Sequence, residues 1–191
     1  PITPPVNNGS GATVPEVISY NPTQNLQLPT NNGMFVVNTT PQSQYLVETN
    51  PILTDYLSFI GTDYLLSRLG FDPAELQRRL GDAFYETRLL REGLFNLFGQ
   101  RYLTDQNTGL AFTSDTEQFQ YLMDNAIAAN EELELSVGIA LSAEQVAQLT
   151  HDIVWLVEQD VNGEKVLAPV YYASAARAGD LDNKGALMTG Q

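Results

Sequence analysis

The feature that most constrains this chain is the stretch of residues 79–92, which opens a long run of apolar residues at helical spacing. Gly81-Asp82 marks the start of that run, which continues to Gly99. The apolar side chains recur every three or four residues, which predicts a long amphipathic helix that ends at Gly99. Such a helix buries its apolar stripe in a core and leaves charged side chains on the opposite face. The chain therefore needs a packed body around this helix, built on Phe84, Tyr85, Leu89, Leu94, Phe95 and Phe98.

Other segments predict a mainly helical body. Ser114 with Glu117, and Ser142 with Gln145, have the spacing of capping boxes, in which a serine hydroxyl accepts from a helix amide and the later side chain reaches back. Asp72-Pro73 is typical of a helix start. Together with apolar spacing, these signals predict helices over residues 51–60, 62–69, 73–80, 115–127 and 143–157.

A few short strands are also expected. Residues 34–37 and 45–47 are β-prone, and Asn162-Gly163 predicts a type I′ turn. That turn would join a short strand near Val161 to one that ends at Tyr172. The β-branched residues that follow Asp152 fit a strand as well as a helix, so residues 153–159 stay open between the two.

The 191 residues divide into three parts by composition. Residues 1–33 are rich in Pro and Asn and indicate a linker or an arm draped over a surface. Residues 34–175 indicate a helical globular domain with short strands. Residues 176–191 alternate apolar and turn residues like one rung of a β-solenoid. The expected fold class is α+β, mainly α, with a C-terminal segment that enters a β-solenoid.

Charge and composition exclude several functions at this stage. The net charge is −14, from 23 acidic and 9 basic residues, which argues against binding of nucleic acid or anionic lipid. No apolar run reaches the ~18 residues of a membrane span. The absence of cysteine removes disulfides and thiolate chemistry. It fits both a cytosolic protein and an exported one.

Few residues are candidates for chemistry. His151, the one histidine, has no nucleophile motif beside it, and we expect it on a helix face. Asp180, Asp182 and Lys184 resemble the start of a calcium loop, but lysine is wrong at the fifth position, so a solenoid turn is favoured.

Pairs of carboxylates suited to glycoside hydrolysis arise by chance in so acidic a chain. The candidates for such a pair are Glu48, Asp55, Asp63, Asp82 and Glu86. Sequence does not give the distance between them. We assign no catalytic, cofactor-binding or metal-binding residue and expect no cofactor.

Most of the basic residues lie within residues 68–101. Arginine suits bidentate pairing with carboxylates, so internal ion pairs are the favoured interpretation in this acidic chain. The alternative is an arginine-lined recognition face. Its candidate residues are Arg78, Arg79, Arg88 and Arg91.

Several segments resemble a known family in their order and spacing over residues 34–191. They are Tyr45-Leu46-Val47-Glu48-Thr49-Asn50-Pro51, Arg79-Leu80-Gly81-Asp82, Tyr85-Glu86-x-Arg88-Leu89, Ala140-Leu141-Ser142-Ala143-Glu144-Gln145 and His151-Asp152-Ile153-Val154-Trp155-Leu156-Val157-Glu158. The chain is similar to a non-repeat domain of filamentous-haemagglutinin-like exoproteins, including toxin-delivery proteins of contact-dependent growth inhibition. In that family the domain lies just ahead of a block of haemagglutinin repeats.

The resemblance implies a Gram-negative two-partner-secretion protein, secreted and displayed on the bacterial cell surface. From it we expect a non-catalytic module of an adhesin-like exoprotein that serves adhesion or toxin delivery, and no enzyme. Its partners would be flanking β-solenoid repeats, an outer-membrane transporter during secretion, and a target-cell surface protein; nucleic acid is not expected. A receptor-binding module and a carboxylate-based hydrolase are the alternatives.

Overall fold

The centre of the protein is a mixed β-sheet of six strands. The computed structural model describes residues 17–31, 33–54 and 59–184. The strand order is β1-β6-β4-β3-β2, with β5 paired to β6. Pairs β3–β4 and β4–β6 are parallel, and the others are antiparallel. The strands are β1 (Ser19–Tyr20), β2 (Phe35–Val37), β3 (Tyr45–Thr49), β4 (Arg79–Gly81), β5 (Ile153–Val161) and β6 (Glu164–Tyr172).

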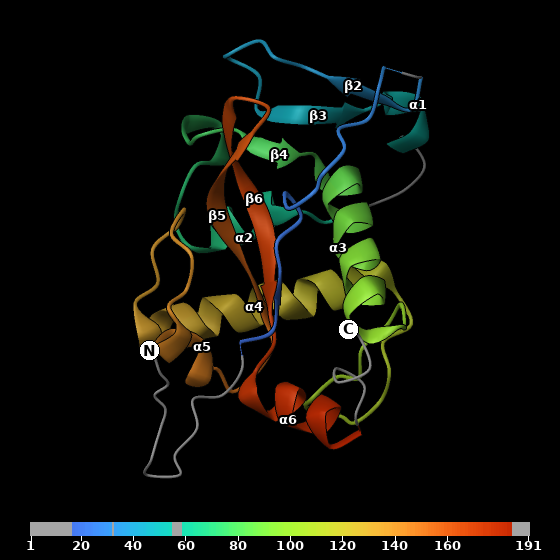
Figure 1. Cartoon of the computed structure of the whole chain (residues 1–191). Coiled ribbons are helices and arrows are strands. Elements are labelled where there is room, and N and C mark those ends of the chain that lie inside the picture. The colour runs from blue at the N-terminus through green and yellow to red at the C-terminus, as the bar shows by residue number, and fades with distance from the viewer. Residues whose placement is uncertain (1–16, 32, 55–58, 185–191) are drawn as a thin grey trace, which may run out of the picture.

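The longest part of the sheet is the β5–β6 ribbon, which runs through the middle of the molecule (Figure 1). Its turn has positive φ at Asn162 and Gly163, as a type I′ turn requires, so the predicted hairpin is confirmed. The strand before the turn begins at Ile153, and residues 153–157 are all buried. A continuous buried run with β-branched residues favours a strand in a covered sheet. Of the two alternatives left open for residues 153–159, the strand is therefore confirmed, and the helix predicted over 143–157 is limited to residues 143–147.

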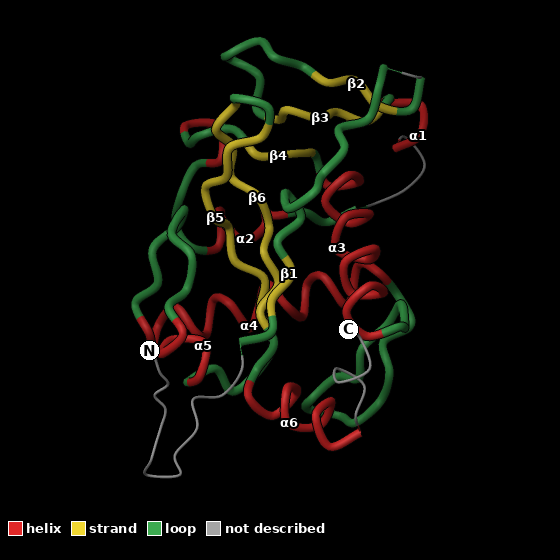
Figure 2. Tube along the Cα trace, in the orientation of Figure 1, coloured by secondary structure: helices red, strands yellow, loops and turns green. Residues whose placement is uncertain are grey.

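Helices surround this sheet, and several begin where the sequence predicts (Figure 2). Ser142 caps α5 with a complete capping box, and the Ser114 hydroxyl accepts from the Glu117 amide at the start of α4. Gly99 ends α3 in the left-handed region. The helices are α1 (Pro51–Thr54), α2 (Thr62–Arg68), the 3-10 turn η1 (Pro73–Glu75), α3 (Ala83–Phe98), α4 (Asp115–Leu133), α5 (Ala143–Ala147) and α6 (Ala175–Lys184).

The predicted helix over 73–80 is wrong, whereas the helix predicted from Asp82 to Gly99 is confirmed as α3. Only Pro73–Glu75 form a helical turn, and residues 79–81 form β4, which lies between β3 and β6. Asp82 then caps α3 by accepting from the Tyr85 amide. Leu80, expected on a helix stripe, is fully buried in the sheet. Helical spacing held for the residues after Asp82 and did not extend back across the strand.

The expected fold class, mainly helical with an entry into a β-solenoid, is wrong. The body is organised by a six-stranded sheet, and residues 175–184 form α6 instead of a solenoid rung or calcium loop. The rest of that expected segment, residues 185–191, lies outside the described part of the chain. No helix of the described residues has the length and hydropathy of a membrane span.

The core has two main parts. The larger cluster packs α2, α3 and α4 against β5 and β6, around Trp155, Phe119 and Leu94. The smaller cluster fills the space between α3 and the β2–β3–β4 end of the sheet. Residues 17–20 contribute to the larger part, because Ile18 is buried there and β1 pairs with the end of β6.

Candidate functional site

Two polar clusters lie inside this fold, and both join elements that are far apart in the sequence. The first, called the Glu86 cluster, brings together β3, α2, β4 and α3. The second, called the Asp152 cluster, joins the loop 104–107, α4, β5 and α6. The Glu86 cluster consists of Tyr45, Thr62, Asp63, Arg79 and Glu86, and the Asp152 cluster of Thr104, Gln106, Tyr121, Asp152, Ser174 and Arg177.

Glu86 projects from α3 onto the N-terminus of α2. Its Oε1 accepts from the Thr62 amide at 2.7 Å, and its Oε2 accepts from the Thr62 hydroxyl. The N-cap residue of α2 is Gly61, which has no side chain to serve this purpose. A Cβ at Gly61 would lie 2.7 Å from Glu86 Oε1 and 2.8 Å from Ala83 Cα. Glu86 therefore caps α2 from another helix, and Gly61 gives it the space.

Arg79 lies next to this cap, in the central strand β4. Its side chain is fully buried, and its Nε forms an ion pair with Asp63 Oδ1 at 3.1 Å. Nη1 donates to the carbonyl oxygens of Pro73 and Gln77. Nη2 has no hydrogen-bond partner among the described residues. The Tyr45 hydroxyl donates to the other oxygen of Asp63, so both carboxylate oxygens of Asp63 are held.

Burial determines the electrostatics of the Glu86 cluster. The pKa of Glu86 is raised to about 8, mainly by burial and also by the nearby charge of Asp63, although the Thr62 hydrogen bonds and Arg79 oppose the shift. Burial and the bond to Asp63 raise the pKa of Tyr45 well above its usual value. A cavity of about 260 Å³ opens beside Tyr45, Asp63 and Glu86. These groups combine an acid that holds its proton near neutrality with a paired carboxylate.

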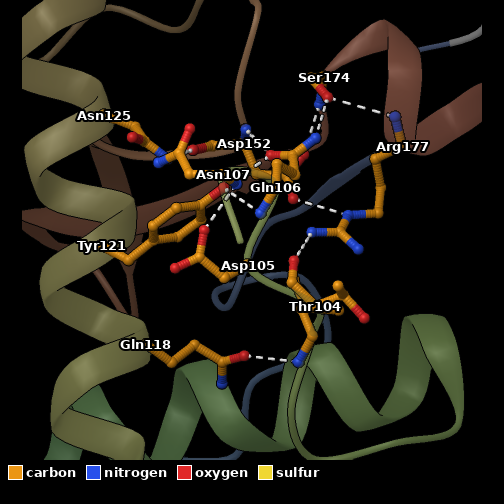
Figure 3. A network of polar contacts seen from close by, with 11 residues as sticks. Thr104, Asp105, Gln106, Asn107, Gln118, Tyr121, Asn125, Asp152, Ser174 and Arg177 are labelled. Atoms are coloured by element: carbon orange, nitrogen blue, oxygen red, sulfur yellow. Dashed lines mark hydrogen bonds and ion pairs between the residues drawn. The ribbon is translucent and has the colours of Figure 1, made fainter. Parts of the chain in front are cut away.

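The Asp152 cluster is centred on a carboxylate with no exposed surface (Figure 3). Asp152 Oδ1 accepts from the Ser174 amide at 2.8 Å, and Oδ2 accepts from Arg177 Nε at 2.7 Å. Arg177 also donates to the Thr104 carbonyl oxygen at 2.8 Å. The Arg177 guanidinium thus joins α6 to the start of β5 and to the loop 104–107.

Gln106 completes the same cluster from the loop side. Its Oε1 accepts from the Asp152 amide and from the Tyr121 hydroxyl, both at 3.0 Å, and its Nε2 donates to Ser174 Oγ (Figure 3). Asn125 of α4 donates to the Asp152 carbonyl oxygen. These contacts fasten the loop 104–107, α4, the start of β5 and α6 together.

The structure separates the four arginines expected on one face. Arg78 and Arg79 are buried, and because neighbouring strand residues point to opposite sides, they reach different partners. Arg78 bonds the loop 38–43 and pairs with Glu164. Arg88 and Arg91 lie on α3 with side chains 39% and 38% exposed, paired with Glu92 and Asp115 respectively. A recognition role for Arg88 and Arg91 stays a prediction.

The carboxylates predicted as candidates for hydrolysis divide between the Glu86 cluster and ordinary structural contacts, and His151 has ordinary polar partners. Asp63 and Glu86 are the two predicted carboxylates that the structure brings together. Asp82 binds Thr49 and caps α3, and Glu48 accepts from Asn38; Asp55 lies outside the described residues. His151 contacts Thr150 Oγ1 and Asn107 Oδ1. No group of three His, Asp or Glu residues in the described ranges is arranged to hold a metal ion.

Sequence reasoning missed Asp152 and Arg177 as a pair. Asp152 falls inside the helix predicted over 143–157, whereas it immediately precedes a strand whose first five residues are buried. One signal could have indicated this buried pair. A charged residue, Asp152, stands directly before an apolar strand, and an arginine lies at the start of the helix that follows the next strand. The separation of 25 residues between them hides it from local pattern analysis.

Comparison with known proteins relates the chain to large toxins. It is 36% identical over 194 residues to the tRNA nuclease CdiA of Yersinia mollaretii, a match that covers 84% of this chain. It is 35% identical to the deoxyribonuclease CdiA of Dickeya dadantii, over 92% of this chain. It is 34% identical to the 16S rRNA endonuclease CdiA of Enterobacter cloacae, over 78% of this chain. The chain spans only 5–6% of the length of these relatives.

No family model matches the chain, and no solved structure matches it. The homologues are contact-dependent growth inhibition proteins of Gram-negative bacteria, so the predicted resemblance is confirmed at that level. Their names describe nuclease toxins and do not support a domain ahead of haemagglutinin repeats, an adhesin or a β-helix.

Three functional expectations are contradicted by these names. We expected a non-catalytic module, no enzyme and no nucleic-acid partner, whereas the relatives are named for cleavage of tRNA, DNA and 16S rRNA. The expectations failed because they were based on a short segment of much longer proteins. The charge of −14 and the missing catalytic motifs concern 191 residues, and the matched segment makes up 5–6% of each relative. Neither observation extends to the remaining length of such a protein.

Proposed function

We propose that the protein of which this chain is a part is a contact-dependent growth inhibition toxin that cleaves nucleic acid in the target cell. The observation that carries the proposal is the extent of the similarity. Relatives named CdiA match between 75% and 94% of the chain at 34–37% identity. A match over three quarters or more of the chain favours a shared role in the same kind of protein.

We further infer that residues outside this chain choose the nucleic acid that is cleaved. The relatives named for tRNA, DNA and 16S rRNA match the chain almost equally, at 36%, 35% and 34% identity. Cleavage of DNA and of a structured RNA needs different contacts with the sugar, because only RNA presents a 2′-hydroxyl. A segment that specified the substrate would be expected to favour the relatives that share it.

The charge of the chain supports the same inference. Contacts with phosphates require lysine and arginine, and each contact contributes to binding through counterion release. This chain has 9 basic residues against 23 acidic ones, and several of its arginines are already paired with carboxylates. The contacts that hold nucleic acid are therefore assigned to other parts of the toxin. Export from a Gram-negative producer, followed by action inside the target cell, is part of the proposal.

A co-culture experiment tests this function. A strain that produces the full-length protein is mixed with susceptible target cells, and total tRNA, 16S rRNA and DNA are isolated from the targets. We expect growth inhibition that depends on cell contact and fragmentation of one of the three nucleic acids. A producer strain with the gene deleted is the control. Growth inhibition with all three nucleic acids intact would contradict the proposed nuclease activity.

The purified 191-residue chain is tested in parallel. We expect no cleavage of tRNA, 16S rRNA or plasmid DNA, with or without added magnesium, because the substrate contacts lie elsewhere in the toxin. Cleavage by the isolated chain would contradict the inference about substrate choice and leave the nuclease proposal intact. A Glu86→Gln variant would then show whether the Glu86 cluster supplies the proton-transfer group.

A further inference from the structure

The Glu86 cluster contains a buried carboxyl group that caps a helix and has no role in the proposed nuclease function. Glu86 is 1% exposed, yet the N-terminus of α2 depends on its carboxyl group, because Gly61 offers no cap of its own. Oε1 holds the first amide of α2 and Oε2 holds the Thr62 hydroxyl. The cavity beside Tyr45, Gly61 and Asp63 lies next to the same carboxyl group. A change at Glu86 therefore acts directly on the junction between α2 and α3.

We propose that Glu86 is a proton-controlled clasp between α3 and the N-terminus of α2, which holds when the carboxyl group is protonated and loosens when it ionises. The protonated group keeps both contacts with Thr62, since one oxygen still accepts from the amide and the hydroxyl pair remains. The ionised group is buried at a cost, because charge in a low-dielectric interior is disfavoured. Opening of the junction hydrates the carboxylate and relieves that cost.

The charged groups around Glu86 set the direction of the effect. On α2, Asp63 adds a negative charge that opposes ionisation of Glu86. On β4, Arg79 favours ionisation, but its Nε is paired with Asp63. On β3, Tyr45 donates to Asp63 and holds its own proton more tightly than usual. The arginine that favours ionisation of Glu86 is thus already paired with another carboxylate.

The sign of the pH dependence follows from these contacts. Burial raises the pKa of Glu86 in the closed form to about 8, whereas an open, hydrated glutamate titrates near its usual ~4.3. The closed form then binds the proton more tightly than the open form. Its stability is fully present below the lower pKa and is lost as the pH rises through the higher one. The inference does not depend on the nuclease proposal.

Hydrogen exchange of the purified chain tests the clasp. Protection factors of the amides at Thr62 and within α2 are measured at pH 5, 6, 7 and 8. We expect the opening constant of wild type to rise by up to about tenfold for each pH unit in this window. Glu86→Gln keeps an acceptor and a donor for Thr62 without titrating, so its opening constant should be flat. Glu92→Gln on the same helix, with a side chain 52% exposed, is the matched control and should follow wild type.

A second measurement covers the case in which Glu86→Gln does not fold. Carboxyl ¹³C signals of wild type, labelled at glutamate, are followed from pH 3 to pH 9. We expect one signal with a midpoint above pH 6.5. If every glutamate titrates below pH 6, or if Glu86→Gln shows the pH dependence of wild type in hydrogen exchange, the clasp is excluded.

Discussion

Replacing Arg177 with methionine should destabilise the protein strongly, because it leaves the Asp152 carboxylate charged and buried. Asp152 has no exposed surface, and Arg177 is 11% exposed, so solvent screens this pair little. Removing the 2.7 Å bond from Arg177 Nε leaves Asp152 Oδ2 without its charged partner, while Oδ1 keeps the Ser174 amide. Breaking a buried pair in this way costs about 3–5 kcal/mol in free energy of unfolding.

The bond from Arg177 to the Thr104 carbonyl oxygen adds about 1 kcal/mol to that cost. We expect a total loss of about 4–6 kcal/mol, a large share of the ~5–15 kcal/mol that stabilises a typical domain. Urea denaturation followed by circular dichroism measures it. Arg101→Met is the control, because its side chain is 51% exposed and its pair with Asp115 should contribute less than about 1 kcal/mol.

A double-mutant cycle refines this prediction. Asp152→Asn removes the negative charge, so the double variant Asp152→Asn/Arg177→Met should lose less stability than the two single variants combined. The expected coupling energy is at least about 1.5 kcal/mol for a charged pair in direct contact. A loss below about 1 kcal/mol in Arg177→Met, or additive effects in the cycle, would show that the Asp152 cluster does not fasten α6 as described.

Three further changes test other contacts. Gly61→Ala should lower the free energy of unfolding by about 2 kcal/mol in thermal or urea denaturation, because the new Cβ would lie 2.7 Å from Glu86 Oε1. An unchanged stability would contradict this close packing. Partial burial tends to raise the pKa of Asp115, but Arg101 and Arg91 lower it below its usual value. The stability that these ion pairs give the folded protein should therefore be lost as the pH falls through that lowered pKa. Asp115→Asn should therefore flatten stability below pH 4, and an unchanged acid limb would oppose the pairing. Trp155→Phe removes a 2.9 Å bond to a backbone carbonyl oxygen and should cost about 1 kcal/mol; near-zero loss by the same assay would argue against that bond.

Local chemistry made the helix ends and the hairpin predictable. Ser114 and Ser142 cap helices as their spacing indicates, and Gly99 ends α3 with positive φ. Asn162-Gly163 forms the expected turn, since both residues tolerate positive φ. Each of these features depends on residues within four positions of one another, so the sequence displays it directly.

The sheet could not be predicted in the same way. Its strands β1 and β4 contain two and three residues, too few to show an alternating pattern. The parallel pairs that surround β4 join residues far apart, such as Arg79 with Tyr45 on one side and Leu167 on the other. Pairing at that range is decided by the packing of the whole body, which local propensity does not contain.

The candidate sites, like the sheet, depend on residues that lie far apart in the sequence. Asp63 and Glu86 were named among five acidic residues, but no local pattern pairs them, because Glu86 lies 24 residues from Thr62, the neighbour of Asp63. The functional error had a different cause. The acidic charge describes the surface of this chain correctly, and the mistake was to extend it to a protein many times longer.

An exchange between relatives tests the central claim most directly. In the tRNA nuclease CdiA of Escherichia coli strain 536, which is 37% identical over 177 residues, the matching segment is replaced by this chain. Producer cells with the hybrid are mixed with susceptible targets, and target tRNA, 16S rRNA and DNA are analysed. We predict contact-dependent inhibition with cleavage of tRNA, because the substrate is chosen outside the exchanged segment. Cleavage of a different nucleic acid, or loss of inhibition by a hybrid that is produced at normal levels, would contradict the account.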